Sequence, residues 1–257
     1  MVNPDRKWAL IIGGSQGLGL ASAKELASDG FSLVIIHRDS RVQMEKIDKD
    51  FESLKKSKQE VLTFNKDALK TETIDIIKEV CLKKNIKFKV LLHSLAKGNL
   101  KPLFGENSLS TDDYQQTINA MAVNFYTWAK AVVDTKVYST DAKFIAFTSE
   151  GNSRVLKNYG AVSAAKSTLE AITRQMAVEF APFKITSNCI QAGVTATDSL
   201  MRIPNAENII EFNQRRNPFK RLTQPGDVGK VVSLLASDKA NWINGCVIPV
   251  DGGERLI

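Results

Sequence analysis

Short apolar segments rich in β-branched residues recur along this chain, and segments with helical periodicity separate nearly all of them. Within two of these segments, Leu33–Ile36 and Val90–Leu92, the hydrophobic character is continuous rather than alternating. Continuous runs are typical of strands covered on both faces, as in a parallel sheet. The expected strands are Trp8–Ile12, Phe31–His37, Glu60–Asn65, Phe88–His93, Phe144–Ser149, Ile185–Ile190 and Cys246–Val250. The pattern predicts an α/β fold with a doubly wound parallel sheet of about seven strands and helices on both faces.

The length favours a single domain. With 257 residues, of which 43% are hydrophobic and 25% charged, the chain can form one well-buried α/β domain and leaves little for a second. A polar stretch that contains Pro204 and Pro218 interrupts the strand-helix alternation between Val194 and Gln224. Because this stretch is long for a plain connection, we expect one domain over residues 1–257 with a substrate lid at about 194–224.

Composition argues against several classes of protein. No segment approaches the roughly 20 apolar residues of a membrane span, and residues 1–7 lead into the first strand without the apolar core of a secretory signal. We therefore expect a cytoplasmic protein without membrane association. Cys81, Cys189 and Cys246 are scattered and only two histidines are present, so neither a disulfide framework nor a metal site is predicted.

The formal net charge of +7 favours an acidic partner, such as nucleic acid, anionic lipid or an acidic carrier protein. No run of five or more basic residues occurs, and the aromatic residues, at 7%, are not interleaved among arginines as stacking platforms would be. Nucleic-acid binding is therefore not expected. Basic residues gather around the expected lid and form either a docking surface or a solvated basic face: Arg202, Arg215, Arg216, Lys220 and Arg221.

A glycine-rich turn, Gly13–Gly19, lies directly after the first expected strand and opens a helical segment. Such a turn lets backbone atoms approach a pyrophosphate while the amides of the helix N-terminus face its charge. The spacing is G-x3-G-x-G rather than G-x-G-x-x-G, so the turn alone is a weak signal, and a tight turn without a ligand stays an alternative. Its position after the first strand favours dinucleotide binding.

The end of the second expected strand, His37–Arg41, is where such a fold meets the adenosine ribose. Arginine there suits the 2′-phosphate of NADP, so Arg38 and Arg41 favour NADPH over NADH. Asp39 argues the other way, because a carboxylate can bind the ribose diol of NAD, although it can also cap the next helix. After the third strand, Asp67 either lies beside the adenine or is an ordinary turn residue.

The clearest helical pattern follows Lys157 and ends before Pro182. Tyr159 and Lys166 lie near its start and are seven steps apart. Seven steps rotate by about 700°, close to two full turns, so both side chains project from roughly the same face of a helix. Their axial offset of about 10.5 Å indicates that something lies between them.

Several features together resemble the short-chain dehydrogenase/reductase superfamily over essentially the full length. They are the glycine turn, Asp67, the strand-end Ser149, Lys166 and the closing segment Val250–Gly253. The resemblance implies a Rossmann-type fold and a single dinucleotide-binding catalytic domain.

Three details look like the enoyl-[acyl-carrier-protein] reductase branch of that superfamily. Six residues separate Tyr159 from Lys166, whereas the commoner arrangement leaves three; the other two details are the segments Leu92–Ala96 and Ile190–Thr197. Many NADH-preferring members carry a second tyrosine where this chain has Ser149, so the chain looks closer to the NADPH-preferring type.

The resemblance implies catalytic roles for Tyr159, Lys166 and Ser149. The Lys166 ammonium would hydrogen-bond the nicotinamide ribose, and Tyr159 would reach the substrate. In an enoyl thioester the hydride adds to the β-carbon and charge accumulates on the more distant thioester oxygen, which a phenol displaced by about one helical turn can follow. The ordinary tyrosine position, four residues before the lysine, is Val162, which cannot donate a proton and argues against a standard ketoreductase.

The expected function is NADPH-dependent reduction of the trans-2 double bond of enoyl-acyl-carrier-protein thioesters, in fatty-acid or related acyl-chain synthesis. NADH is the second choice of cofactor, acyl carrier protein is the expected partner, and a homotetramer would fit the resemblance. A ketone or 3-ketoacyl reductase and a non-catalytic dinucleotide-binding sensor stay open. The residues expected to bind the cofactor are Gly13, Ser15, Gln16, Gly17, Leu18, Gly19, Arg38, Arg41, Asp67, Ala68, Ser94, Lys166, Gly193, Val194, Thr195 and Thr197.

Two positions depart from the pattern that the resemblance implies. Many members carry an asparagine on the helix before the fifth strand, which supports a proton relay to the lysine; the best register places Met121 there, with Asn119 and Asn124 nearby. A register slip, a relay by water alone or reduced activity would each explain the methionine. Val194 replaces the proline that usually follows the glycine after the sixth strand, although its backbone can still bind the nicotinamide amide.

Overall fold

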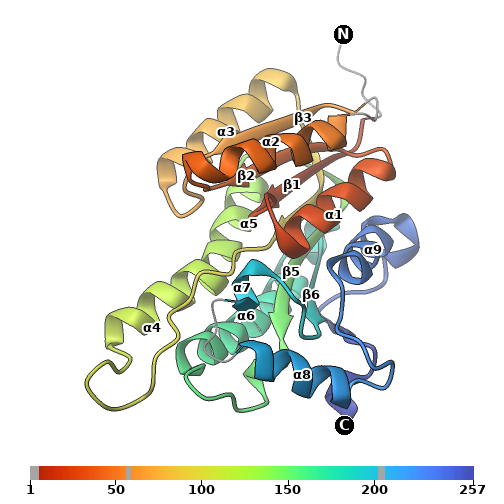
Figure 1. The fold of residues 1–257 in the computed structure, drawn as a ribbon. Coiled ribbons are helices and arrows are strands. Elements are labelled where there is room, and N and C mark those ends of the chain that lie inside the picture. The colour runs from red at the N-terminus through yellow and green to blue at the C-terminus, as the bar shows by residue number, and fades with distance from the viewer. Residues whose placement is uncertain (1–5, 56–58, 202–205) are drawn as a thin grey trace.

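Seven parallel strands form one sheet in the computed structural model of this chain, which describes residues 6–55, 59–201 and 206–257 (Figure 1). Their spatial order is β3-β2-β1-β4-β5-β6-β7. The strand bounds are β1 Trp8–Ile12, β2 Ser32–His37, β3 Val61–Asn65, β4 Phe88–His93, β5 Tyr138–Ser149, β6 Thr186–Ala192 and β7 Val247–Val250. The predicted doubly wound α/β fold is confirmed. Strand β5 begins earlier than predicted, because Tyr138 already pairs with Phe88 before the register between the two strands shifts.

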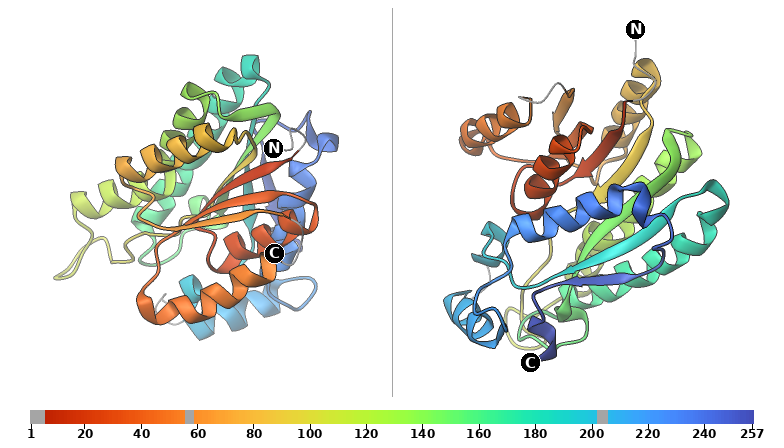
Figure 2. Two further views of the ribbon diagram at one scale, coloured as in Figure 1. Left: turned by 90° about the horizontal axis from the view of Figure 1, so that it is seen from above. Right: turned by 90° about the vertical axis from the view of Figure 1, so that its right-hand side faces the viewer.

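Helices cover both faces of the sheet (Figure 2). Helices α1 (Gly17–Ser28), α2 (Arg41–Lys55) and α9 (Pro225–Ala236) pack on one face, and α3 (Thr71–Lys84), α5 (Asn124–Asp134) and α6 (Gly160–Glu179) pack on the other. Successive residues of a strand point to opposite faces. In β1, Leu10 and Ile12 accordingly join the core under α3, α5 and α6, whereas Ala9 and Ile11 join the core under α1, α2 and α9. This is why the strand is apolar at every position.

The strand order reverses between β1 and β4, which are direct neighbours. In open parallel sheets, ligands bind at the carboxyl ends of the strands beside such a reversal. The connections at this edge hold α4 (Thr111–Ile118), a π turn (Asn119–Val123), α7 (Asp198–Met201) and α8 (Ala206–Arg216). Short 3₁₀ turns cover Glu150–Asn152, Ala181–Phe183, Asp238–Ala240 and Glu254–Leu256.

The excursion that contains α7 and α8 begins and ends at one place, because Thr195 and Thr223 form a parallel bridge. The two ends of the segment that contains both helices are therefore joined at the carboxyl edge of the sheet (Figure 1). This segment coincides with the interruption at 194–224, and its function as a lid stays a prediction. No helix among the described residues is long and apolar enough to span a membrane.

Candidate active site

The glycine turn between β1 and α1 is packed against the chain that leaves β4. Gly13 has φ +87°, and a Cβ atom on it would lie 2.7 Å from the Ser94 carbonyl oxygen. A Cβ on Gly19 would lie 2.0 Å from the Gly13 carbonyl oxygen. The turn therefore forms a cradle of bare backbone at the N-terminus of α1, which fits the pyrophosphate of a dinucleotide. The cradle also contains the buried Ser15 and the half-buried Gln16, Gly17 and Leu18.

Replacing Gly19 by alanine is expected to weaken dinucleotide binding by about tenfold, because the new methyl group displaces the Gly13 carbonyl and narrows the cradle. Gly226→Ala is the matched control, since a Cβ at Gly226 has no atom within 4 Å. Titration of cofactor fluorescence measures both dissociation constants. Equal affinities in the two variants would contradict the assignment of the turn.

At the adenosine end, the structure brings Arg38 and Asp67 together from the ends of β2 and β3. Arg38 Nη1 lies 2.5 Å from Asp67 Oδ2, and Asp67 Oδ1 accepts the Leu69 N–H at 2.9 Å. Burial alone would raise the pKa of Asp67, but the Leu69 N–H and the Arg38 guanidinium lower it. Asp67 is thus both a turn residue and the partner of Arg38. Arg41 is the exposed first residue of α2.

The Asp39 side chain contacts His37 at the end of β2 and Gln16 in the glycine turn. Its Oδ2 lies 2.8 Å from His37 Nδ1, and its Oδ1 accepts from Gln16 Nε2 at 3.4 Å. The side chain of Asp39 is only 10% exposed. Its carboxylate is therefore already engaged next to the glycine turn.

Tyr159 and Ser149 approach each other at the carboxyl end of β5. Tyr159 is the N-cap residue of α6, which begins at Gly160, and its Oη lies 3.5 Å from Ser149 Oγ. Burial raises the pKa of Tyr159, and the hydrogen bond with Ser149 opposes this shift. The phenol is therefore protonated at neutral pH and can act as a donor.

Lys166 lies further along α6 with its side chain buried. Its Nζ donates to the Phe147 carbonyl oxygen at 2.7 Å. Burial lowers the pKa of Lys166 to about 8, against the opposing influence of Cys189 and Glu170. Val162, at the ordinary tyrosine position, is buried in an apolar cluster with Met121 and Ala165.

Asn124 is buried in the helix before β5 and contacts His93 at the end of β4. Asn124 Oδ1 lies 3.2 Å from His93 Nε2, and its Nδ2 donates to the Ala68 carbonyl at 3.0 Å. Burial, with a contribution from the positive charge of Lys166, lowers the pKa of His93 to about 3. His93 is therefore neutral at physiological pH and contacts Asn124. The chain forms a π turn over Asn119–Val123, so the helix is irregular where Met121 lies, and the expectation that Met121 takes the asparagine position stays a prediction.

The segment after β6 lies against the glycine turn. Ser149 and Ala192 are register partners in β5 and β6, so this segment starts beside the catalytic candidates. The Gly193 N–H donates to the Val250 carbonyl at 3.1 Å, and Thr195 Oγ1 donates to the Gly193 carbonyl at 2.9 Å. A Cβ on Gly17 would lie 3.4 Å from the Thr197 methyl group. The two groups of expected cofactor-binding residues thus face one another.

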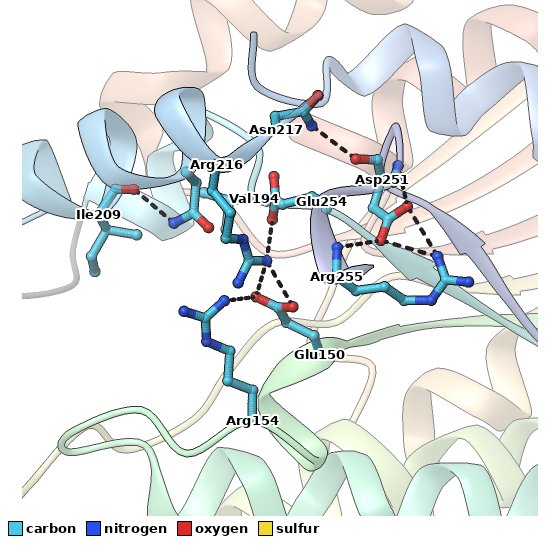
Figure 3. Close-up of polar contacts among 12 residues, drawn as sticks. Glu150, Arg154, Val194, Ile209, Arg216, Asn217, Asp251, Glu254 and Arg255 are labelled. Carbon is cyan, nitrogen blue, oxygen red and sulfur yellow. Dashed lines mark hydrogen bonds and ion pairs between the residues drawn. The ribbon is translucent and has the colours of Figure 1, made fainter. Parts of the chain in front are cut away.

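The basic residues around α8 do not form one solvated face. Arg216 is buried, and its Nη2 lies 2.7 and 2.8 Å from the two carboxylate oxygens of Glu150 (Figure 3). Arg215 is exposed and pairs with Glu211, and Arg221 pairs with Asp227 at 2.6 Å. Lys220 Nζ donates to the Arg215 carbonyl at 2.9 Å. The expectation of a basic surface is wrong for Arg216, because two carboxylates draw it inside; Arg202 lies outside the described residues.

Within residues 6–55, 59–201 and 206–257, no group of three or more His, Cys, Asp or Glu side chains could hold a metal ion. The cysteines are free: Cys81 and Cys189 are buried and Cys246 is exposed. What the site can hold is a dinucleotide, between the cradle, Arg38 and the segment after β6.

Comparison with protein families agrees with this geometry. The model of the family described as "Enoyl-(Acyl carrier protein) reductase" matches residues 13–254. The chain belongs to this family. It is therefore an oxidoreductase of the short-chain dehydrogenase/reductase superfamily, whose members use NAD(P)H.

Relatives of this enoyl-(acyl carrier protein) reductase family member carry varied names. It is 26% identical to "NADPH-dependent aldehyde reductase 2, chloroplastic" of Arabidopsis thaliana, over 96% of this chain and 93% of the relative. It is 25% identical to "3-oxoacyl-[acyl-carrier-protein] reductase MabA" of Mycobacterium bovis, over 96% and 92% of the two chains. The solved structure of FabI from Candidatus Liberibacter asiaticus superposes with a TM-score of 0.85 at 25% identity, covering 100% of this chain and 98% of that one.

Proposed function

We propose that this protein reduces the trans-2 double bond of enoyl thioesters carried on acyl carrier protein, with NADPH as the reductant. The observation that carries the proposal is the placement of the candidate donor. Tyr159, at the N-cap of α6, has its phenol 3.5 Å from Ser149 Oγ, while the ordinary position, Val162, is buried in an apolar cluster. A donor displaced along the helix from Lys166 suits an oxygen that is remote from the carbon receiving the hydride.

The chain's own residues fit a dinucleotide. Side-chain atoms would fill the space at Gly13 and Gly19, so bare backbone is available for the pyrophosphate. Thr195 and Thr197 belong to the segment after β6 that faces the glycine turn, and Lys166 supplies a buried ammonium. When bound, the cofactor would supply a hydride to the substrate β-carbon.

Three side chains would then act on the substrate and its charge. Tyr159 donates a hydrogen bond to the thioester oxygen, where negative charge accumulates after hydride addition. Ser149 orients the phenol through the 3.5 Å contact. The Lys166 ammonium stabilises the same charge electrostatically and orients the ribose. Protonation of the α-carbon completes the reduction.

NADPH is favoured over NADH by the state of the two side chains at the end of β2. The Arg38 side chain pairs with Asp67 through Nη1, but it is 62% exposed and its guanidinium has further N–H donors for a 2′-phosphate. The Asp39 carboxylate already pairs with His37 and Gln16 and is only 10% exposed. A carboxylate that is engaged in this way is not available to a ribose diol. The Arabidopsis relative is likewise named for its use of NADPH.

Replacing Arg38 by glutamine is expected to raise the KM for NADPH by about tenfold to a hundredfold and to leave the KM for NADH nearly unchanged, because a charge-assisted hydrogen bond to phosphate is lost. Steady-state kinetics with both cofactors measures the ratio. Arg6→Gln serves as control, since Arg6 is also paired with a carboxylate, Glu60, at 3.0 Å. Equal losses with NADPH and NADH would contradict the assignment of Arg38.

The decisive assay for the function follows NADPH oxidation with a crotonyl or longer enoyl thioester and with the matching 3-ketoacyl thioester. Turnover of the enoyl thioester is expected, and acyl carrier protein as the carrier should lower its KM. Reduction of the ketone alone would overturn the proposal.

A 3-ketoacyl or other carbonyl reductase is the second candidate. The observation that favours it is that relatives named as a 3-oxoacyl reductase and an aldehyde reductase match at 25% and 26% identity over nearly the full chain. In that reaction Ser149 or Tyr159 would donate to the carbonyl oxygen itself. Turnover of the 3-ketoacyl thioester without turnover of the enoyl thioester would support this second function, and its survival in Tyr159→Phe would assign the donor to Ser149.

A further inference from the structure

Val194 brings a backbone N–H to a position where the resemblance to this family leads us to expect proline. Proline has no N–H and fixes its own φ, whereas valine has a donor and a freer backbone. The added N–H needs an acceptor once it is removed from water. In the structure it donates to Glu254 Oε1 at 3.1 Å. Glu254 therefore supplies the acceptor that the N–H of Val194 requires.

Glu254 comes from the last turn of the described chain, Glu254–Leu256, and its side chain is only 1% exposed. The same oxygen that accepts the Val194 N–H lies 3.4 Å from Arg216 Nη2, at the end of α8. Arg216 also binds Glu150, which directly follows Ser149 (Figure 3). One carboxylate thus connects the cofactor-binding segment, helix α8 and the turn next to the catalytic candidates.

This cluster is poorly explained as a device for stability. Burial raises the pKa of Glu254, and the Glu150 charge adds to this, while the Val194 N–H, the Arg216 charge and the Asn217 side chain lower it. Among the described residues, Glu254 Oε2 and Arg216 Nε are buried without a hydrogen-bond partner. A buried ion pair with unsatisfied atoms is often no more stabilising than apolar residues of the same size. The hydrogen bond from the Val194 N–H is therefore the contact of this carboxylate that points to a role beyond stability.

We propose that Glu254 is a positioning residue for the cofactor-binding segment Gly193–Thr197. Its hydrogen bond to the Val194 N–H fixes the backbone of the segment at that residue, and its contact with Arg216 connects the segment to α8. The inference rests on the proposed function only in requiring that a dinucleotide binds between the glycine turn and this segment.

The test compares NADPH dissociation constants, measured by fluorescence titration without turnover. Glu254→Met removes the acceptor and keeps the volume, and it is expected to weaken NADPH binding by about tenfold. Glu254→Gln retains an oxygen that can accept the Val194 N–H, so a loss of less than about threefold is expected. Arg255→Met is the matched control in the same turn, because Arg255 contacts Asp251 and not the segment.

Combining variants separates positioning from a general structural role. In a Val194→Pro background, which has no N–H to hold, Glu254→Met is expected to weaken NADPH binding by less than about threefold. A role in folding alone would lower the melting temperature equally in both backgrounds and leave the dissociation constants, taken well below it, unchanged. Equal tenfold losses in the two backgrounds, or wild-type affinity in Glu254→Met, overturn the inference.

Hydrogen exchange in the wild-type chain gives a second reading that needs no variant. The Val194 amide is expected to exchange more slowly than an unstructured amide and to slow further with NADPH, and exchange at the unstructured rate overturns the inference. Failure to bind either NADPH or NADH overturns it as well. NADPH binding with the expected Glu254 effect but no enoyl reduction overturns the proposed function alone.

Discussion

Replacing Tyr159 by phenylalanine is expected to lower kcat for enoyl reduction by a factor of about 10² to 10⁴ and to change the dissociation constant of NADPH by less than about twofold. The phenol is the group that donates to the oxygen where charge accumulates, so its loss affects the transition state. The ring itself keeps its packing, because only the hydroxyl near Ser149 is removed. Steady-state kinetics with an enoyl thioester, beside cofactor titration, separates the two quantities.

The matched control is Tyr138→Phe, the same chemical change at the start of β5, at the opposite end of that strand from Ser149. It should retain wild-type kcat. Because burial raises the pKa of Tyr159, the phenol keeps its proton through the neutral and mildly alkaline range, so its ionisation should not limit the rate below pH 9 or so. A Tyr159→Phe protein with full kcat would remove the assigned role of the tyrosine.

The fold could be predicted from the sequence because short local patterns of apolar residues determine its strands and helices. Strands β1, β2 and β4 are buried at every position, so Leu10 and Ile11 are both apolar although they face different cores. The alternation of such runs with helical periods leaves few other topologies. The cradle could also be predicted, because the glycine turn directly follows the first strand in the sequence. The structure explains its glycines, since a Cβ at Gly13 or Gly19 would collide with backbone.

Other parts of the site could not be predicted from the sequence, because they depend on tertiary contacts or on an irregular turn. The helix before β5 contains a π turn, which a regular helical period cannot reveal, and the sequence also does not show that Asn124 contacts His93. Arg216 looks like its exposed neighbours in sequence, and only the fold brings Glu150 and Glu254 to it. The sequence shows the departure at Val194, but the partner of its N–H, Glu254, lies 60 residues further on.

Replacing Lys166 by methionine is expected to lower kcat/KM by a factor of about 10² to 10³, because a buried ammonium that stabilises developing charge is lost. The wild-type protein should show an alkaline limb in kcat/KM. Burial lowers the pKa of Lys166 to about 8, and the charged form, which is the active one, is present below that pH and lost as the pH rises through it. The residual activity of Lys166→Met should lack this limb.

Lys143 provides a matched control for that limb. It is also a buried lysine whose pKa is lowered, by burial and by the charge of Lys89, but its Nζ donates to Asn241 away from the carboxyl edge of the sheet. Lys143→Met can change stability, yet it should keep the fall in kcat/KM above about pH 8, because Lys166 is intact. Since the pKa of Tyr159 is raised rather than lowered, a limb that persists in Lys166→Met cannot be assigned to the phenol and would contradict the role of Lys166 as the titrating group.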